Sequence, residues 1–458
     1  MSGSAGAELG RFAASLRAAA IPDPVLERLR CGLLHDIAVA LAAHPVGAEV
    51  WPLVRDRRPA EATLLCDGGR VGAHEAAFAN AQLIHARAQD DTHFGAKTHV
   101  GAAVIPAALA LAEREGASGA AFATAVLVGC EVAAAVGERH AAAATARGFR
   151  ASPLFGTLGA AAASASLLGL DAAAAADAIA LSSSFAGGLN QTWIDGSSEY
   201  RIELGMAARN GMLAADLAAS GQHGARYWYE GAAGFAHAFD GTSDDVPGPG
   251  EWVDGSWELG TRWRLLDVTY KPYPVCAILQ SAVDVAISLA RENDLDADAV
   301  TGIEVQLNPQ DRTYPGTVNS GPYGDVAATL MSAEYCVAMA LRDRTATLAG
   351  LRGFEDPQLA RMIGVTDVRG VDRIPALGAR VEVEVDGRGG AQRLGGELIP
   401  DPSTYGWDWD GVLANVERME PEIAVSRDQL DALAAAVRDV TALSSVDDLV
   451  RLTVPVAA

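Results

Sequence analysis

The chain has 458 residues, half of them hydrophobic, which is enough for two packed domains and too much for one comfortable core. Its 35 Lys and Arg residues against 58 Asp and Glu residues give a formal net charge of -23, which argues against nucleic acid or an anionic membrane as the main partner. The five cysteines show no CxxC spacing, and neither a signal peptide nor a membrane-spanning run stands out, so we expect a reducing, cytoplasmic location.

The N-terminal part of the chain has a helical pattern. Asp23 and Pro24 precede a segment with apolar residues at helical spacing, which predicts a helix that begins there. A short hairpin is expected over residues 61–73, with its turn at Gly68 and Gly69. From residue 76 to 217 alanine dominates and the breaks fall at Gly or Pro. This composition predicts a bundle of closely packed helices.

The C-terminal part changes character. Residues 301–309 and 379–387 alternate apolar and polar side chains, which predicts strands. Helices are expected over 277–292 and 327–341, and again between 410 and 458. We therefore predict a mainly α protein with a large all-helical domain and a smaller α+β domain. The predicted helical domain is discontinuous, with residues 1–269 and 401–458, and the α+β domain covers 270–400.

The stretch from His85 to Leu109 gathers three histidines, two adjacent aspartates, two threonines and a lysine directly before a buried helix. A histidine titrates near neutral pH and a nearby carboxylate can orient it, so the pattern favours acid/base work. His99 is the first candidate for proton transfer. Two alternatives remain open: Asp90, Asp91 and Thr92 could simply cap the helix, and the cluster could hold a divalent metal, although its spacing matches no metal motif and none is expected.

Three further polar segments could face the same site. Arg150 lies at a joint before a helix, where it could clamp a carboxylate or be a solvated surface residue. A loop from 190 to 201, which ends with Tyr200 and Arg201, could bind a ligand or only turn. Lys271 is held by the two prolines that follow it, either as a site residue or in an interdomain hinge. A Pro- and Gly-rich loop with Tyr323 could be a lid or an ordinary surface loop.

Together these segments resemble the MmgE/PrpD family, which includes 2-methylcitrate dehydratase, cis-aconitate decarboxylase and iminodisuccinate epimerase. The resemblance runs in the same order over roughly residues 5 to 445 and is carried by HARAQDDTHFGAKTHVGAAVIPAALALAE, GCEVAAAVGERH, RGFRASPLFGTLGAAAASASLLGLD, YRIELGMAARNGMLAADLAASG, EGAAGFAHAF and YKPYPVCAILQSAVDVA. It implies a helical domain built from both chain ends, a smaller α+β domain, a cleft between them, no cofactor, and usually a homodimer.

The family motifs are only partly kept. In the Asp-x-Asp-Asp-Thr element Asp91 and Thr92 match, but the first, often catalytic, aspartate is Ala88. The His-Pro-Gly element keeps its histidine as His99 and has Val100 in place of proline. At three other positions the chain departs from the family's common residue: Arg150 and Gln280 stand where histidines are frequent, and Tyr200 stands where a lysine is usual. Lys271 and Cys276 match the family's residues.

The resemblance implies a cofactor-independent enzyme that acts on a small di- or tricarboxylate, at a carbon next to a carboxylate. Its expected catalytic residues are His99, Asp91, which would orient His99, and Lys271. The expected substrate-binding residues are Thr92, Arg150, Tyr200, Arg201, Tyr323 and Gln280. Dehydration of the 2-methylcitrate type is the first choice, followed by cis-aconitate-type decarboxylation and by epimerisation of a dicarboxylate. A hypothesis of another class is a non-catalytic paralogue that binds the ligand without turnover.

Overall fold

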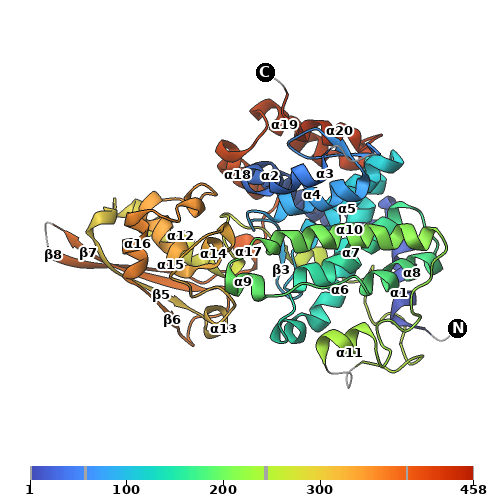
Figure 1. The fold of residues 1–458 in the computed structure, drawn as a ribbon, viewed down its shortest axis with the longest axis horizontal. Helices are drawn as coiled ribbons and strands as arrows, with labels where there is room; N and C mark the ends of the chain where they lie inside the picture. Colours follow the sequence, from blue (N-terminus) through green and yellow to red (C-terminus); the bar gives the residue numbers. More distant parts are fainter. Residues whose placement is uncertain (1–2, 56–58, 242–245, 388–389, 457–458) are drawn as a thin grey trace.

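The computed structural model describes residues 3–55, 59–241, 246–387 and 390–456. It is mainly α-helical, with a large helical body and a smaller α+β part at one end (Figure 1), which confirms the predicted fold class. The helices of the body are α1 (Ala5–Ser15), α2 (Asp23–Gly47), α3 (Trp51–Val54), α4 (Ala73–His85), α5 (Val100–Glu115), α6 (Gly119–Ala146), α7 (Ala151–Leu167), α8 (Ala172–Ser183), α9 (Gln191–Asp195), α10 (Glu199–Ala219), α11 (Phe235–Asp240), α17 (Pro402–Tyr405), α18 (Trp409–Met419), α19 (Arg427–Arg438) and α20 (Asp447–Val450).

Small side chains let the helices of the body approach one another closely. A Cβ atom added to Gly129 of α6 would lie 2.7 Å from the carbonyl oxygen of Gly159 in α7, and the reverse substitution would bring the same separation. Helices α5 and α7 are buried along nearly their whole length. This tight centre fixes where α5 and α7 begin, and both N-termini face the candidate site.

A four-stranded sheet forms the smaller part, with strand order β6-β5-β7-β8. Its strands are β5 (Val300–Leu307), β6 (Thr366–Gly370), β7 (Ala379–Gly387) and β8 (Gly390–Leu398). The β5–β6 pair is parallel and the other pairs are antiparallel. Helices α12 (Gln280–Glu292), α15 (Ala333–Asp343) and α16 (Pro357–Gly364) pack on the sheet, and α13 (Pro309–Arg312) and α14 (Val326–Met331) lie toward the helical body (Figure 1).

Two short ladders complete the fold. Strands β1 (Ala62–Thr63) and β2 (Arg70–Val71) form the predicted hairpin. Strand β3 (Thr92–His93) pairs with β4 (Val268–Thr269) and so joins segments far apart in the chain. The main chain beyond β4 stays on the helical body, because Gln89 and Asn415 both donate hydrogen bonds to the carbonyl oxygen of Lys271. The boundary predicted between residues 269 and 270 therefore separates Lys271 from the body that holds it.

The ends of the chain meet in the helical body. Helices α18 and α19 pack on α2, and Figure 1 shows both beside the N-terminal helices rather than beside the sheet. Two stretches of the described chain, Asp23–Val54 and Gly119–Ala146, are long and apolar enough to cross a membrane, which the sequence pattern did not indicate. In the fold, 67% and 89% of their most apolar windows are buried, so packing inside the helical body accounts for their composition.

Candidate active site

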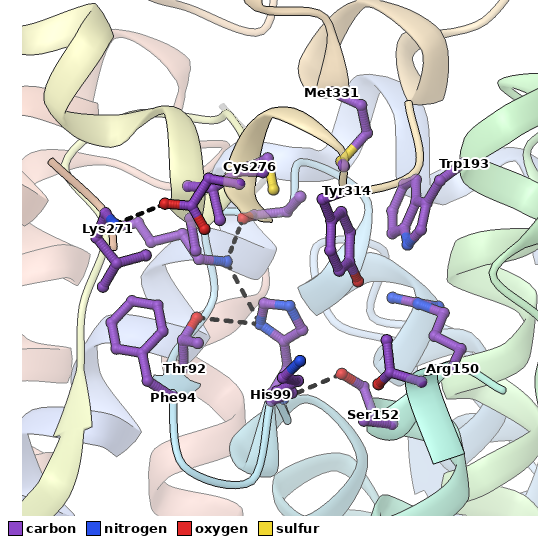
Figure 2. Close-up of a pocket in the computed structure, with 18 of the residues that line it drawn as sticks. Thr92, Phe94, His99, Arg150, Ser152, Trp193, Lys271, Cys276, Tyr314 and Met331 are labelled. Carbon is purple, nitrogen blue, oxygen red and sulfur yellow. Dashed lines mark hydrogen bonds between the residues drawn. The ribbon is translucent and has the colours of Figure 1, made fainter. Parts of the chain in front are cut away.

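A cavity of about 310 Å³ lies between the helical body and the smaller domain, a size that suits a small metabolite. The helical body supplies most of its polar side chains, among them His99, Arg150 and Ser152. The smaller domain supplies Tyr314, Met331 and other largely apolar side chains on the opposite side (Figure 2). The acid/base candidates and the apolar wall therefore face each other across the cavity.

His99 is the last residue before α5 and lines this cavity. Its backbone N–H donates to Oγ of Ser152 at 3.2 Å, which ties the start of α5 to the start of α7. Its Nδ1 lies 2.6 Å from the carbonyl oxygen of Asp91. Since a carbonyl oxygen only accepts, Nδ1 carries the proton and Nε2 is left with a free lone pair. Burial, together with the charge of Lys271, holds the pKa of His99 well below its usual value, so the imidazole is neutral at neutral pH.

Lys271 reaches the same point from the segment after β4 (Figure 2). Its Nζ donates to the carbonyl oxygen of Ala88 at 2.5 Å and lies 3.3 Å from Nδ1 of His99. A carboxylate oxygen of Asp90 lies 4.0 Å away. Burial lowers the pKa of Lys271, and the charge of Asp90 opposes that change. An ammonium group and a neutral imidazole thus stand side by side on the cavity wall.

Asp90 is the carboxylate of this cluster, and the sequence-based assignment did not select it. Its side chain is fully buried, with Oδ2 2.9 Å from Nδ1 of His85 and 3.5 Å from Nδ1 of His99. Burial alone would raise its pKa, but His85, His99 and Lys271 hold it below the usual value. Asp90 therefore stays ionised and compensates the charge of Lys271. Its neighbour Asp91 is the same residue type, so the direction that the backbone gives each side chain decides which aspartate joins the cluster.

Asp91 was expected to orient His99 through its side chain, and the structure places that side chain elsewhere. Both carboxylate oxygens accept from the backbone N–H of Gly101 in the first turn of α5, at 3.0 and 3.1 Å. Burial, together with the charge of Asp90, raises the pKa of Asp91 to about 8. Asp91 thus serves as a helix cap, the alternative left open for this segment, and only its carbonyl oxygen contacts His99.

Arg150 lines the cavity directly before α7 but is already paired. Its guanidinium lies over the ring of Trp193 at 4.8 Å, and Nη1 contacts Glu203 at 2.9 Å. The same group donates to the carbonyl oxygen of Tyr200, and Nη2 donates to Nε2 of His85. This last bond leaves Nδ1–H of His85 for Asp90. Arg150 therefore holds one end of the buried cluster and offers its charge to a ligand only in competition with Glu203.

Four expected substrate-binding residues lie outside the cavity wall, because their polar groups are engaged within the protein. The hydroxyl of Tyr200 donates to the carbonyl oxygen of Ala86, and Arg201 pairs with Glu49 and, at 3.7 Å, with Asp325. The Tyr323 hydroxyl donates to the carbonyl oxygen of Asn319 at 2.5 Å. The amide of Gln280 donates to the carbonyl oxygens of Tyr273 and Val275 and so shapes the loop after Lys271. These four residues support the site rather than line it.

Thr92 does line the cavity, with Oγ1 3.4 Å from Nδ1 of His99. Several other lining residues were not selected from the sequence: Ser152, Trp193, Ile278, Asp311, Tyr314, Leu330, Met331 and Leu377. They come from separate segments. Three of them lie in segments that the sequence had singled out: Ser152 beside Arg150, Trp193 in the 190–201 loop, and Tyr314, which precedes a Pro-Gly pair in a loop expected to be rigid. The hydroxyl of Tyr314 has no hydrogen-bond partner among the described residues, and burial raises its pKa to about 12, so it can donate to a ligand.

At this site, three side chains could in principle hold a metal ion. One ligand atom from each of His85, Asp90 and His99 lies within 4.8 Å of the others. The ammonium of Lys271 lies beside this group, and Arg150 donates to His85. Both cations would repel a divalent ion, and His85 Nδ1 and His99 Nδ1 already have protein partners. The donor set fits an internal ion-pair network better than a metal site.

Comparison with known protein families identifies the family of this chain. The model of the MmgE/PrpD N-terminal domain matches residues 7–246, and that of the MmgE/PrpD C-terminal domain matches residues 273–393. The chain belongs to the MmgE/PrpD family. The resemblance inferred from the sequence motifs is thereby confirmed, and the two matched regions cover most of the helical body and most of the α+β part.

Among curated MmgE/PrpD relatives, a cis-aconitate decarboxylase of Aspergillus terreus is 28% identical over 371 residues, 76% of this chain and 74% of that protein. A cis-aconitate decarboxylase-like protein, oryM, of Aspergillus oryzae is 30% identical over 283 residues, 59% of this chain and 58% of that protein. A second Aspergillus terreus cis-aconitate decarboxylase is 27% identical over 370 residues. The chain is thus an enzyme of a lyase family.

The structure shows where the residues that depart from the MmgE/PrpD motifs lie. Ala88 lines the cavity, so the missing carboxylate leaves a small apolar side chain at the wall. Its carbonyl oxygen still binds Lys271, and its backbone has a left-handed φ of 50°. Arg150 forms an ion pair where a histidine is frequent, and Gln280 bonds to backbone atoms. The site of this MmgE/PrpD member therefore keeps an imidazole and an ammonium and has lost one cavity carboxylate.

Proposed function

We propose that the chain is a cofactor-independent carboxy-lyase that decarboxylates a small unsaturated carboxylic acid. The observation that carries the proposal is the pair formed by the Lys271 ammonium and the neutral His99 imidazole, 3.3 Å apart on the cavity wall. The N-termini of α5 and α7 meet beside them, and a helix N-terminus favours an anion. This reaction requires a binding site for one anionic group of the substrate and one proton donor.

The reaction needs few groups. The bond between the leaving carboxylate and its carbon breaks, CO2 departs, and the electron pair delocalises into the second, conjugated carboxylate. Lys271 and the helix N-termini stabilise the resulting enolate-like charge. The carbanion then takes a proton from the Lys271 ammonium, and Lys271 is reprotonated from solvent. An apolar surface beside the departing group favours loss of charge as CO2.

Dehydration was the first choice from the sequence, and two points reverse the order. A hydro-lyase must remove a proton and also protonate a leaving hydroxyl, and Ala88 has replaced one carboxylate of the cavity. The curated relatives that the chain matches carry the name of a decarboxylase. One observation keeps dehydration as the second candidate: Asp311 lines the cavity, and burial raises its pKa. Asp311 could supply the second acid.

Proton NMR in D2O tests the proposal and separates the alternatives. The protein is incubated with cis-aconitate, 2-methylcitrate and iminodisuccinate, and the His99→Gln variant is run beside it. Release of CO2 with one deuterium in the product supports decarboxylation. Loss of water identifies a hydro-lyase, and exchange without either loss identifies an epimerase. A ligand that binds without exchange or turnover would favour the non-catalytic paralogue, and a stoichiometric metal in active protein would contradict the cofactor-free mechanism.

We also propose that the protein works as a homodimer. Phe185, Ile202 and Met206 are exposed apolar residues around one surface pocket on α10. Leu189 and Ile194, which are 53% and 59% exposed, lie on the neighbouring loop and on α9. A group of exposed apolar side chains of this kind is typical of an interaction surface. Light scattering should show a dimer for the native chain and a monomer for Ile194→Asp with Met206→Asp, while exposed Val253→Asp should leave the dimer intact.

A further inference from the structure

We propose that the substrate of this cavity carries one or two carboxylates and an apolar substituent, rather than three carboxylates. This proposal rests on the proposed use of the cavity as a carboxylate site. It is drawn from two properties of the wall: its buried cations are compensated within the protein, and the side opposite His99 has a cluster of apolar side chains.

The first property is the balance of charge. Three cations line the cavity, Lys97, Arg150 and Lys271. Two of them face a carboxylate: Lys271 has Asp90 at 4.0 Å, and Arg150 has Glu203 at 2.9 Å. Lys97 is exposed to solvent. What remains inside the cavity for a ligand is the positive end of α5 and of α7, each equivalent to roughly half an elementary charge. A third substrate carboxylate would lose its hydration and find no buried cation without a paired carboxylate.

Several hydrogen-bond donors lie close together on one region of the wall. The Lys271 ammonium lies next to His99, and the first backbone amides of α7, at Ala151 and Ser152, face the same side. The hydroxyl of Tyr314 points toward this region in Figure 2. These groups can hold one carboxylate and orient a second. They define a polar end of the cavity.

The second property is the apolar surface across from that end. Ile278, Leu330, Met331 and Leu377 come from the smaller domain and line the cavity together with Trp193. Figure 2 shows Met331 above Tyr314 and Trp193 to its right, away from Thr92 and Phe94 at the lower left. A carboxylate placed against these side chains would be desolvated without a donor from them, whereas an alkyl group would bury apolar area. The geometry therefore fits a ligand with a charged head and an apolar arm.

Binding of unreactive ligands tests the inference without relying on turnover. Isothermal titration with succinate, methylsuccinate, butylsuccinate and tricarballylate compares alkyl arms with a third carboxylate. A fully buried methylene is worth about a fourfold change in Kd, so butylsuccinate should bind at least about tenfold more tightly than succinate. Tricarballylate should bind no better than succinate. Tighter binding of tricarballylate than of butylsuccinate would overturn the proposal.

Two variants and a control locate the effect. Met331→Gln, which conserves volume, and Ile278→Asn should remove most of the advantage of butylsuccinate while leaving succinate binding unchanged. Ile399→Asn is the control, because Ile399 is 45% exposed in the smaller domain and outside the lining. An unchanged advantage in both lining variants would contradict the apolar arm.

A third variant tests the charge balance. Glu203→Gln leaves Arg150 without its carboxylate and should strengthen tricarballylate binding by about tenfold, on the scale of one charge-assisted contact. Unchanged tricarballylate affinity in this variant would show that charge compensation does not limit the number of carboxylates that the ligand can carry. The outcomes stay separable from those of the proposed function. If the protein prefers alkyl ligands but turns over no substrate, the decarboxylase proposal fails and the inferred ligand class stands. If it turns over substrate but binds tricarballylate tightly, the ligand class fails and the decarboxylase proposal stands.

Discussion

The ammonium nitrogen of Lys271 lies 3.3 Å from Nδ1 of His99 although the two residues are 172 positions apart. We expect either His99→Gln or Lys271→Met to lower kcat by about 10²- to 10⁴-fold, the usual contribution of a positioned acid or base. Steady-state kinetics with the substrate found by NMR measure the effect. His223→Gln is the matched control, since that side chain is 81% exposed. Retained kcat in both variants would remove this pair from the mechanism.

The two adjacent aspartates should differ in their effect on the pH profile. Asp90 raises the pKa of Lys271, so Asp90→Asn should move the alkaline limb of kcat/KM to lower pH, because the ammonium then loses its proton earlier. Asp91 has a pKa of about 8 and is neutral below that pH, so Asp91→Asn should keep both the cap on Gly101 and the profile. Equal shifts in the two variants would contradict these assignments.

Buried histidines should make stability depend on pH. Burial lowers the pKa of His35 from 6.5 to about 4, and its Nε2 lies 2.9 Å from the carbonyl oxygen of Gln89. Between these values the unfolded chain binds more protons, so the free energy of unfolding falls as pH decreases from 6.5 to 4. The contribution of His35 is about 3 kcal/mol. Urea unfolding across this range should show a smaller loss for His35→Gln. His85, whose pKa is also lowered to about 4, should keep part of the slope.

Gly101 should tolerate no side chain. A Cβ atom there would lie 1.9 Å from Oδ2 of Asp36, which is fully buried. Gly101→Ala should therefore cost about 1–3 kcal/mol of stability, as other overpacking changes do, and should displace Asp91 and the start of α5. Gly187→Ala is the control, because nothing lies within 4 Å of its added Cβ. Equal unfolding midpoints for the two variants would contradict the close contact.

The strands of the smaller domain show what periodicity can predict. Alternating apolar residues identified β5 and β7, whose Val305 and Val381 pair in the sheet. Strand β8 was not expected, since its sequence is polar and glycine-containing and most of its residues are exposed. It is an edge strand, held by its ladder to β7. A strand that is buried on one face has alternating apolar and polar residues, whereas an exposed edge strand need not show this alternation.

For the site, the motifs predicted the segments better than the individual side chains. His99 and Lys271 were selected and lie together. Asp91 was selected in place of Asp90, because two neighbouring aspartates differ only in the direction that the backbone gives them. Gln280 and Tyr323 come from segments near the cavity, but hydrogen bonds turn their polar groups away from it. The apolar wall could not be predicted, because its residues come together only when the smaller domain folds.

The main-chain bonds that keep Lys271 on the helical body separate two tasks in this molecule. Lys271 and His99, the groups of the proposed decarboxylation, belong to one part, and the other part contributes most of the surface that a substrate's variable portion would touch. Changes in the sheet domain can therefore alter which molecule is accepted without disturbing the chemistry. Such a division gives evolution a route to new substrates, and it gives a designer a defined half of the protein in which to exchange side chains.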